Sequence, residues 1–316
     1  MVRVERLEGN PIIRPTMLRG TDGDNINGPS LIRAPDWLGG RLATYYLYFA
    51  HHRGTYIRLA YAENLIGPWT IYEPGTLRLA NRRRDCLGNP AWAKRRHLAS
   101  PDIHVDDRAR EIRMYFHGAV YTGGPPDSWG SYQQQTFVAT STDGLHFEVL
   151  PEPLGNSYFR VFTWDGAYYA LAMPGVFYRS VDGLQRFAQG PTLFTPDMRH
   201  AAVKVDSHTL WVFYSVVGDS PERILLSTID LTRPWMEWAP SKPVVVLEPE
   251  TDWEGVQHPV RPSIRGPARQ VRELRDPAIF VESGKSYLLY SVAGESGIAI
   301  ADLHRPRTAS ELADGG

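Results

Sequence analysis

A unit of three or four short apolar runs, separated by tight turns, recurs along this chain and limits its fold more than any other sequence feature. The copy at 274–303 is the clearest, with apolar runs at 278–280, 287–292 and 298–301. The other copies share this layout and begin near residues 28, 100, 158 and 199. About five copies at a spacing of about 40–60 residues lie near the range of propeller repeats.

Short β-rich runs joined by Gly-containing turns predict antiparallel meanders. One such sheet cannot bury both of its faces, whereas sheets packed radially hide them and leave only short protected edges. The sequence therefore predicts an all-β fold, a five-bladed β-propeller with antiparallel four-stranded blades. Because the last copy has three clear strands, we expect the strand-like residues 2–6 to close the last blade. We expect one domain over 1–316, with a dispensable polar tail at 304–316.

Charge and hydropathy patterning exclude several functional classes. The formal net charge is −1, which gives no attraction to nucleic acid or to an anionic membrane. The N-terminal residues lack the apolar segment of a signal peptide, and no run approaches the roughly 18 apolar residues of a membrane span. We therefore expect a cytoplasmic protein without nucleic-acid or membrane partners, and the oligomeric state is left open.

Metal and thiol chemistry have little support in the sequence. Cys86 is the single cysteine, so an intrachain disulfide is ruled out. His51, His52 and His104 lack the spacing of zinc ligands. We expect no metal ligands and no cofactor, although a structural calcium ion on the channel axis stays open.

Three long excursions interrupt the repeat, at 75–99, 119–135 and 250–273. Long loops on a regular repeat usually gather on one functional face. The first excursion is rich in arginine and lysine, which fits either a solvated basic loop or a lid that attracts an anionic ligand.

The candidate site follows from where each repeat begins. In a propeller the first strand of each blade lines the central channel, so its starting residues gather at one mouth. Carboxylates there accept hydrogen bonds from sugar hydroxyls, and a pair of them can act at an anomeric carbon. The candidate catalytic acids are Asp24, Asp102 and Asp276. The candidate substrate-binding residues are Asn27, His51, His104, Arg160, Arg199, His200, Arg275 and Glu295.

Asp102 and Asp276 both lie beside a proline at the start of a repeat, a position that also suits a turn or strand-cap aspartate. If they form a catalytic pair, we expect both carboxyl groups at the same mouth of the channel. Their separation would be about 5–5.5 Å for a retaining enzyme or about 6.5–9.5 Å for an inverting one.

Several short motifs add a family resemblance over about residues 10–303. They are Asn10-Pro11-Ile12-Ile13, Gly67-Pro68-Trp69, Ser100-Pro101-Asp102-Ile103, Ser141-Thr142-Asp143-Gly144-Leu145-His146-Phe147 and Arg275-Asp276-Pro277. With these motifs the chain resembles the five-bladed β-propeller glycosidase superfamily, which includes arabinanases, β-xylosidases, invertases and mannoside phosphorylases. The resemblance implies that Asp102 tunes the general acid and that Asp276 belongs to an aspartate motif of the invertase-like group.

The sequence also departs from that superfamily. The usual base is an aspartate directly before the first inner strand, whereas Asn27-Gly28-Pro29 stands here, and the usual third-blade glutamate is missing from 155–162. The resemblance implies a glycoside hydrolase acting on an oligosaccharide, with a small-molecule carbohydrate as its partner. A phosphate-dependent glycoside phosphorylase and a non-catalytic carbohydrate-binding propeller are the alternatives.

Overall fold

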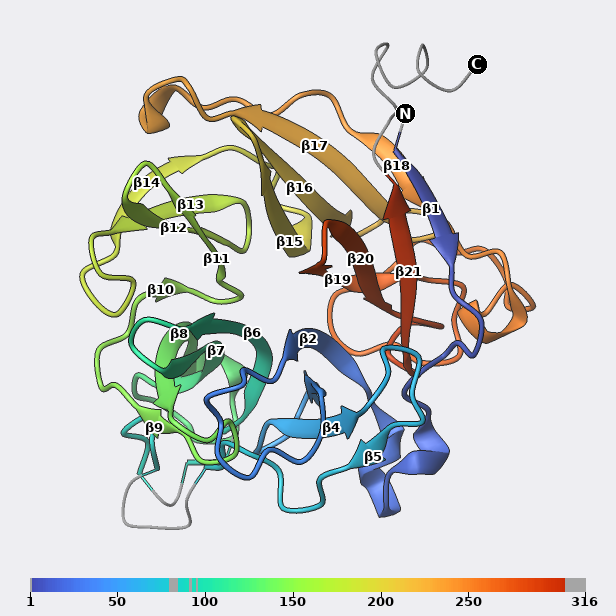
Figure 1. Ribbon diagram of the computed structural model, residues 1–316, viewed down its shortest axis with the longest axis horizontal. Helices are drawn as coiled ribbons and strands as arrows, with labels where there is room; N and C mark the ends of the chain where they lie inside the picture. The colour runs from blue at the N-terminus through green and yellow to red at the C-terminus, as the bar shows by residue number, and fades with distance from the viewer. Residues whose placement is uncertain (1, 80–84, 91–92, 95, 305–316) are drawn as a thin grey trace.

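The computed structural model describes residues 2–79, 85–90, 93–94 and 96–304. Their strands form five antiparallel sheets arranged around a central axis, as the ribbon in Figure 1 shows. The predicted all-β, five-bladed β-propeller is therefore confirmed. The arginine-rich part of the first excursion, at 80–84 and 95, and the expected tail beyond His304 lie outside the described residues.

The first three blades follow the chain in order, each starting with the strand nearest the axis. The first blade is β2 (Asn27–Arg33), β3 (Tyr45–Ala50), β4 (Arg58–Ala62) and β5 (Thr70–Ile71). The second is β6 (Leu98–Asp106), β7 (Glu111–Tyr121) and β8 (Tyr132–Ser141), and β8 also pairs with β9 (Glu148–Val149) and β10 (Gly155–Asn156). The third is β11 (Arg160–Trp164), β12 (Ala167–Ala172), β13 (Val176–Ser180) and β14 (Ala188–Thr192).

The last two blades complete the ring. The fourth is β15 (Met198–Asp206), β16 (Thr209–Val216), β17 (Ile224–Asp230) and β18 (Val244–Leu247). The fifth is β19 (Arg275–Glu282), β20 (Lys285–Ser291), β21 (Ile298–His304) and β1 (Arg3–Arg6). The short 3-10 helices are η1 (Pro15–Met17), η2 (Gly20–Asp24), η3 (Trp129–Ser131), η4 (Trp235–Glu237) and η5 (Asp252–Glu254). Among the described residues, none of the helices could reach across a lipid bilayer.

The ends of the described chain meet in the fifth blade. Strand β1 pairs antiparallel with β21, with Arg3 opposite His304, and the two lie side by side in Figure 1. The side chain of Asn10 continues this pairing through two hydrogen bonds with the backbone of Ile300. Arg6 then binds Glu254 with two of its nitrogens, at 2.8 and 3.0 Å. This junction ties the N-terminal strand to the excursion that precedes the fifth blade.

The hydrophobic core is divided among the blade interfaces. Separate clusters of buried apolar side chains fill the junctions between neighbouring blades, including the one between the fifth blade and the first. Tyrosine hydroxyls cross two of these junctions. Tyr48 donates to the carbonyl oxygen of Gly144 at 2.8 Å, and Tyr115 donates to that of Gly183 at 2.7 Å. Both acceptors belong to Ser-x-Asp-Gly-Leu turns, so this turn locks a blade to the one before it.

Candidate functional site

The inner strands share a local distortion at the mouth of the channel. In the first, second, fourth and fifth blades the pairing of the innermost strand shifts register near its start. One residue of each blade has a left-handed backbone there: Gly28 (φ 57), Ser100 (φ 50), Tyr158 (φ 71), His200 (φ 48) and Asp276 (φ 49). We call these five positions the bulge ring. A non-glycine residue in this region costs about 1–3 kcal/mol, and such residues cluster at functional sites.

The bulge ring sets two levels along the channel. Ser100, Tyr158, His200 and Asp276 line a cavity of about 290 Å³ at the mouth, which we call the mouth cavity. The residues two positions further along each strand line a second cavity of about 150 Å³, the channel cavity, and they are Ser30, Asp102, Arg160, Ala202 and Ala278. Two residues of sequence therefore separate a side chain in the mouth from one in the channel.

All five blades contribute to the mouth cavity. Its lining residues are Asn27 and His52 of the first blade, His97, Ala99, Ser100, His117, Trp129 and Gln134 of the second, Ser157, Tyr158 and Met173 of the third, His200 of the fourth and Asp276 of the fifth. Trp129 lies on the excursion between β7 and β8, so this long loop builds part of the site. The lining includes four histidines and one carboxylate, Asp276, and neither arginine nor lysine within the described residues.

Asp276 is the one carboxylate in the described lining of this cavity. Its side chain is 2% exposed, and Oδ1 accepts a 2.6 Å hydrogen bond from the hydroxyl of Tyr158. Nδ1 of His200 lies 3.5 Å from the same oxygen. Burial, assisted by the negative charge of Glu295, raises the pKa of the Asp276 carboxyl above its ordinary value, against the opposing effects of Tyr158, Arg275 and Arg199. A carboxyl in this setting holds its proton more tightly than a solvated one.

Several polar atoms around the cavity have no hydrogen-bond partner within the described part of the chain. They are buried and comprise Asn27 Oδ1, His117 Nδ1, Gln134 Oε1, His200 Nδ1 and Asp276 Oδ2. Buried polar atoms of this kind are rare and are usually satisfied by a ligand or by ordered water. Burial is the main cause that lowers the pKa values of His117 and His200, which makes both imidazoles neutral near pH 7. Most of these atoms are acceptors, so a ligand rich in hydroxyl donors complements them.

A buried charge network lies behind the cavity wall. Arg199 is held by Glu222, with Nε at 2.9 Å from Oε1. Arg275 is fully buried and contacts Glu273 at 2.9 Å, Glu222 at 3.1 Å and Glu295 at 3.3 Å. Both guanidinium groups are therefore neutralised by carboxylates. Arg199 and Arg275 support the wall of the site and are not among the described residues that line the mouth cavity, so the substrate contacts expected for them have no support there.

Glu295 extends this network to the first blade. Asn25 donates to Glu295, and its own side-chain oxygen accepts from the backbone N–H of His52 at 2.8 Å and from Asn27 at 3.0 Å. Burial alone would raise the pKa of Glu295, but His52, Arg275 and Asn25 outweigh it and hold the pKa at about 2. Glu295 is 1% exposed, lies beside His52 and is not among the described residues that line the mouth cavity.

Asp102 lies at a different level from Asp276. Its Oδ2 accepts from the backbone N–H of Val161 at 2.8 Å and contacts Nε2 of His104 at 2.9 Å, and it lines the channel cavity. Burial acts to raise its pKa, yet His104 and Arg160 lower it overall. The structure thus does not bring Asp102 and Asp276 to a common cavity.

Arg160 lines the channel cavity and also contacts residues of the bulge ring. Its Nε donates to the carbonyl oxygen of Ala201 at 2.8 Å, and Nη1 reaches the carbonyl oxygens of Ser100 and Pro101 at 3.4 and 3.3 Å. Its guanidinium also lies 4.4 Å from the ring centre of Tyr158. Arg160 therefore lines the channel cavity and supports Tyr158, and it is not among the described residues of the mouth cavity.

Asp24 and His51 also lie outside the mouth cavity. Asp24 ends η2 with a side chain that is 55% exposed and paired with Arg269 at 3.2 Å. Nδ1 of His51 accepts from the backbone N–H of Arg53 at 3.0 Å. Neither arrangement supports the catalytic role expected for Asp24 or the ligand contact expected for His51. Of the expected residues, the structure places Asn27, His200 and Asp276 around one cavity.

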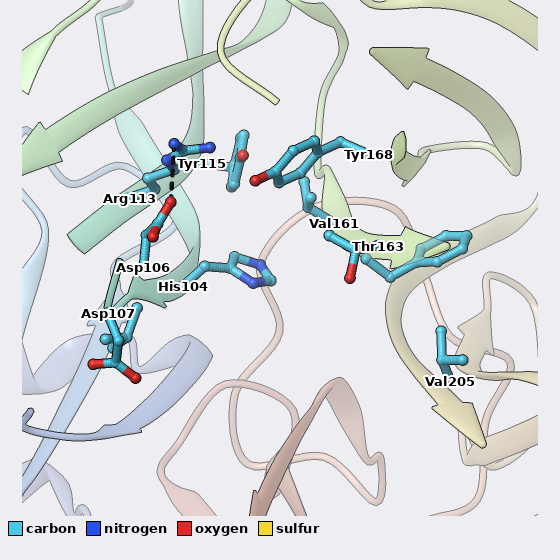
Figure 2. Close-up of a pocket in the computed structure, with 11 residues that line it drawn as sticks. His104, Asp106, Asp107, Arg113, Tyr115, Val161, Thr163, Tyr168 and Val205 are labelled. Carbon is cyan, nitrogen blue, oxygen red and sulfur yellow. Dashed lines mark hydrogen bonds and ion pairs between the residues drawn. The ribbon is translucent and has the colours of Figure 1, made fainter. Parts of the chain in front are cut away.

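His104 faces a separate cavity of about 490 Å³ at the far end of the inner strands, between the second and third blades. Figure 2 shows its ring among Asp106, Thr163 and Tyr168, with Arg113 bound to Asp106 at 3.3 Å. This side cavity is distinct from the mouth cavity. Among the described residues, no cluster of three or more histidine, cysteine, aspartate or glutamate side chains is arranged to hold a metal ion.

The sequence of this chain is similar to that of a viral protein. No family model matches it. It is 36% identical, over 95% of its length and 90% of the relative, to the "Uncharacterized protein R118" of Acanthamoeba polyphaga mimivirus.

Solved structures share the fold at low sequence identity. One belongs to the GH130 family of mannoside phosphorylases, which contains glycoside hydrolases that target β-1,2 mannosidic linkages in Candida mannan (TM-score 0.66, 13% identity, 96% of this chain and 94% of that one). A second is an α-L-arabinofuranosidase from Lactobacillus brevis, with a TM-score of 0.58 and 12% identity over 93% of this chain and 92% of that one. A third is an α-L-arabinanase from Cellvibrio cellulosa complexed with arabinohexaose, with a TM-score of 0.57 and 14% identity over 92% of this chain and 97% of that one. The expected resemblance to five-bladed propeller glycosidases is thus confirmed as a shared fold, and the chain belongs to the same protein family as the mimiviral protein R118.

Proposed function

We propose that this propeller is a glycoside hydrolase that binds a neutral sugar in the mouth cavity and uses Asp276 as its general acid. The observation that carries the proposal is Asp276 itself, a buried carboxyl with a raised pKa whose Oδ2 is unpartnered among the described residues. A carboxyl that holds its proton more tightly than a solvated one can give that proton to the oxygen of a leaving alcohol. The shared fold of sugar-cleaving enzymes supports this proposal by analogy.

The lining of the cavity favours a neutral sugar. Asn27 Oδ1 and Gln134 Oε1 are acceptors, and sugar hydroxyls are the donors that would satisfy them. Trp129 is 43% exposed at the rim, and an indole face of this kind packs well against the apolar face of a sugar ring. Binding a sugar would relieve the cost of these buried polar atoms, which is about 1–3 kcal/mol for each unsatisfied group.

In the reaction, Tyr158 would hold Oδ1 of Asp276 and leave Oδ2 to deliver the proton. The C–O bond to the leaving group then breaks, its electron pair goes to the protonated oxygen, and positive charge develops on the sugar ring. The neutral imidazoles of His117 and His200 would accept sugar hydroxyl protons in hydrogen bonds without adding positive charge near that centre.

Phosphorolysis is the second candidate that the fold suggests. A phosphate ion needs cationic or N–H donors in the site. Arg199 and Arg275 are instead bound by glutamates, and Arg160 donates to backbone carbonyl oxygens. The charges around the site therefore favour water over phosphate as the molecule that attacks the sugar. Inorganic phosphate should leave the rate unchanged, and a glycosyl phosphate product would reverse this choice.

The test is a panel of 4-nitrophenyl glycosides of arabinofuranose, xylose, mannose and galactose in both anomeric forms. We expect the wild-type protein to cleave at least one of them. Asp276→Asn should lower kcat by about 10²–10⁴-fold, the usual contribution of a general acid. Asp24→Asn is the matched control, because Asp24 is exposed and paired with Arg269. Equal activity of wild type and Asp276→Asn would contradict the proposal.

Non-catalytic sugar binding is the remaining alternative, and it is favoured by the single carboxylate, Asp276, in the described lining of the mouth cavity. Binding of the same glycosides without turnover, measured by calorimetry, would favour it. A variant of Gln134, Gln134→Leu, should weaken binding under either function, because it removes an acceptor from the cavity.

A further inference from the structure

We infer that His52, held by Glu295, is the base that removes a proton from the attacking water, and this inference rests on the proposed function. Hydrolysis needs two groups, one to protonate the leaving oxygen and one to activate water. Within the described lining of the mouth cavity, Asp276 is the single carboxyl group. The histidines of this lining are therefore the candidates for the second group.

The four histidines of the lining differ in what stands behind them. His200 lies 3.5 Å from Asp276, on the side of the acid. His97 and His117 pack against each other, with ring centres 5.9 Å apart, and against Trp129 and Tyr158 respectively, each at 5.8 Å. Nδ1 of His52 lies 3.6 Å from Oε1 of Glu295, and its side chain is 37% exposed, so solvent reaches it. His52 thus combines a place in the cavity, access for water and a carboxylate at its rear nitrogen.

The backbone and the carboxylate both fix this imidazole. The N–H of His52 donates to Asn25 at 2.8 Å, and Asn25 also binds Glu295, so one side chain ties both members of the pair. Arg275 binds the same carboxylate at 3.3 Å and keeps it ionised. A proton placed on Nδ1 next to Glu295 leaves the lone pair on Nε2, which is the tautomer that a base requires.

The first blade adds no side chain to the bulge ring, because Gly28 occupies its position there. A Cβ built on Gly28 would lie 3.0 Å from Cα of Ser100, so the backbones of the first two blades approach closely there. His52 comes from the turn after β3 and reaches the cavity from the same blade. Its charged and titratable neighbours are Glu295, His51 and His117.

The step is a single displacement. An oxygen of water bonds to the anomeric carbon as the C–O bond to the leaving group breaks. One water proton passes to Nε2 of His52, while the proton of Asp276 passes to the leaving oxygen. Both side chains then return to their starting protonation states by exchange with solvent. The sugar is released with inverted configuration at the anomeric carbon.

The experiment uses the glycoside that wild type cleaves, as its 4-nitrophenyl and 2,4-dinitrophenyl derivatives. We expect His52→Gln to lower kcat by about 10²–10⁴-fold on both, because activation of water does not depend on the leaving group. The kcat of Asp276→Asn should recover on the dinitrophenyl compound, because its leaving group needs no proton. Azide should restore turnover of His52→Gln and give the inverted glycosyl azide, since azide attacks without losing a proton. His51→Gln is the matched control and should match wild type.

Glu295 has its own readout as a positioning residue. Glu295→Gln should lower kcat with KM nearly unchanged, and azide should restore its turnover, because the defect would lie in the activation of water by His52, whereas a purely structural defect would not be rescued by azide. His52→Gln within about 3-fold of wild type, or release of the retained anomer, would overturn the inference while the proposed function stands. Failure of wild type to cleave any glycoside would overturn both.

Discussion

The hydroxyl of Tyr158 donates a 2.6 Å hydrogen bond to Oδ1 of Asp276, which joins the third blade to the fifth across the mouth of the channel. These two blades are not neighbours in the ring. The contact therefore forms only when the third, fourth and fifth blades are packed together, and it makes the protonation of Asp276 depend on that packing.

Tyr158→Phe tests this contact. The hydrogen bond lowers the pKa of Asp276, so its loss should raise that pKa and extend activity to higher pH on the basic limb of the pH–rate profile. We also expect a lower kcat, because Oδ2 would no longer be fixed. Tyr168→Phe, in the side cavity, is the control. An unchanged basic limb in Tyr158→Phe would show that the bond does not tune the acid.

The depressed pKa of Glu295 predicts an acid-sensitive contribution to stability. Its folded pKa of about 2 lies below the ordinary value of 4.5, so this contribution is present above about pH 4.5 and is lost as the pH falls toward 2. Glu295→Gln should remove this part of the pH dependence, measured as the free energy of unfolding in urea between pH 5 and pH 3. The exposed variant Glu8→Gln should keep the wild-type profile.

Closure of the ring by the N-terminal strand predicts a large effect of one arginine. Glu254 is fully buried and is bound by Arg6 and by the hydroxyl of Tyr290 at 3.0 Å. Arg6→Met would leave a buried carboxylate without its cation, which costs about 3–5 kcal/mol. Thermal unfolding should show a clear drop in Tm, and a Tm unchanged from wild type would mean that the strand pairing alone closes the ring.

The interblade tyrosines predict a smaller effect. Tyr115→Phe keeps the ring in the core and removes the donor to the Gly183 carbonyl oxygen. An unsatisfied buried carbonyl costs about 1–3 kcal/mol. Denaturant unfolding should report a loss in that range, and Tyr48→Phe should behave alike because Tyr48 makes the equivalent bond to Gly144. A loss below about 0.5 kcal/mol would indicate that water replaces the hydroxyl.

The repeat in the sequence was sufficient to predict the fold, since each unit of apolar runs became one blade. The site was harder to predict, and Asp102 and Asp276 show why. Both lie beside a proline, but Asp102 follows Pro101 whereas Asp276 precedes Pro277. If the two segments are aligned on their prolines, Asp102 and Asp276 fall two positions apart. Two positions along a strand also separate a residue of the mouth cavity from one of the channel cavity.

Other site residues carried weaker signals. His51 and His52 are adjacent, and the choice between them depends on how the turn after β3 rotates its side chains. Trp129 lies on a long excursion whose path is set by tertiary contacts and not by the repeat. The pairing of Glu295 with Arg275 joins residues separated by a β-hairpin, and the local pattern of the sequence contains no sign of it.

The left-handed backbone of the bulge ring places the side chains that line the mouth cavity apart from those that pack between the sheets. Replacing Ser100, Tyr158, His200 or Asp276 changes what the mouth presents to a ligand, while the apolar clusters between the blades keep their contacts. New activities on such a scaffold can therefore arise one blade at a time. The first blade is the exception, because a side chain at Gly28 would meet Ser100 at 3.0 Å, and two blades would have to change together.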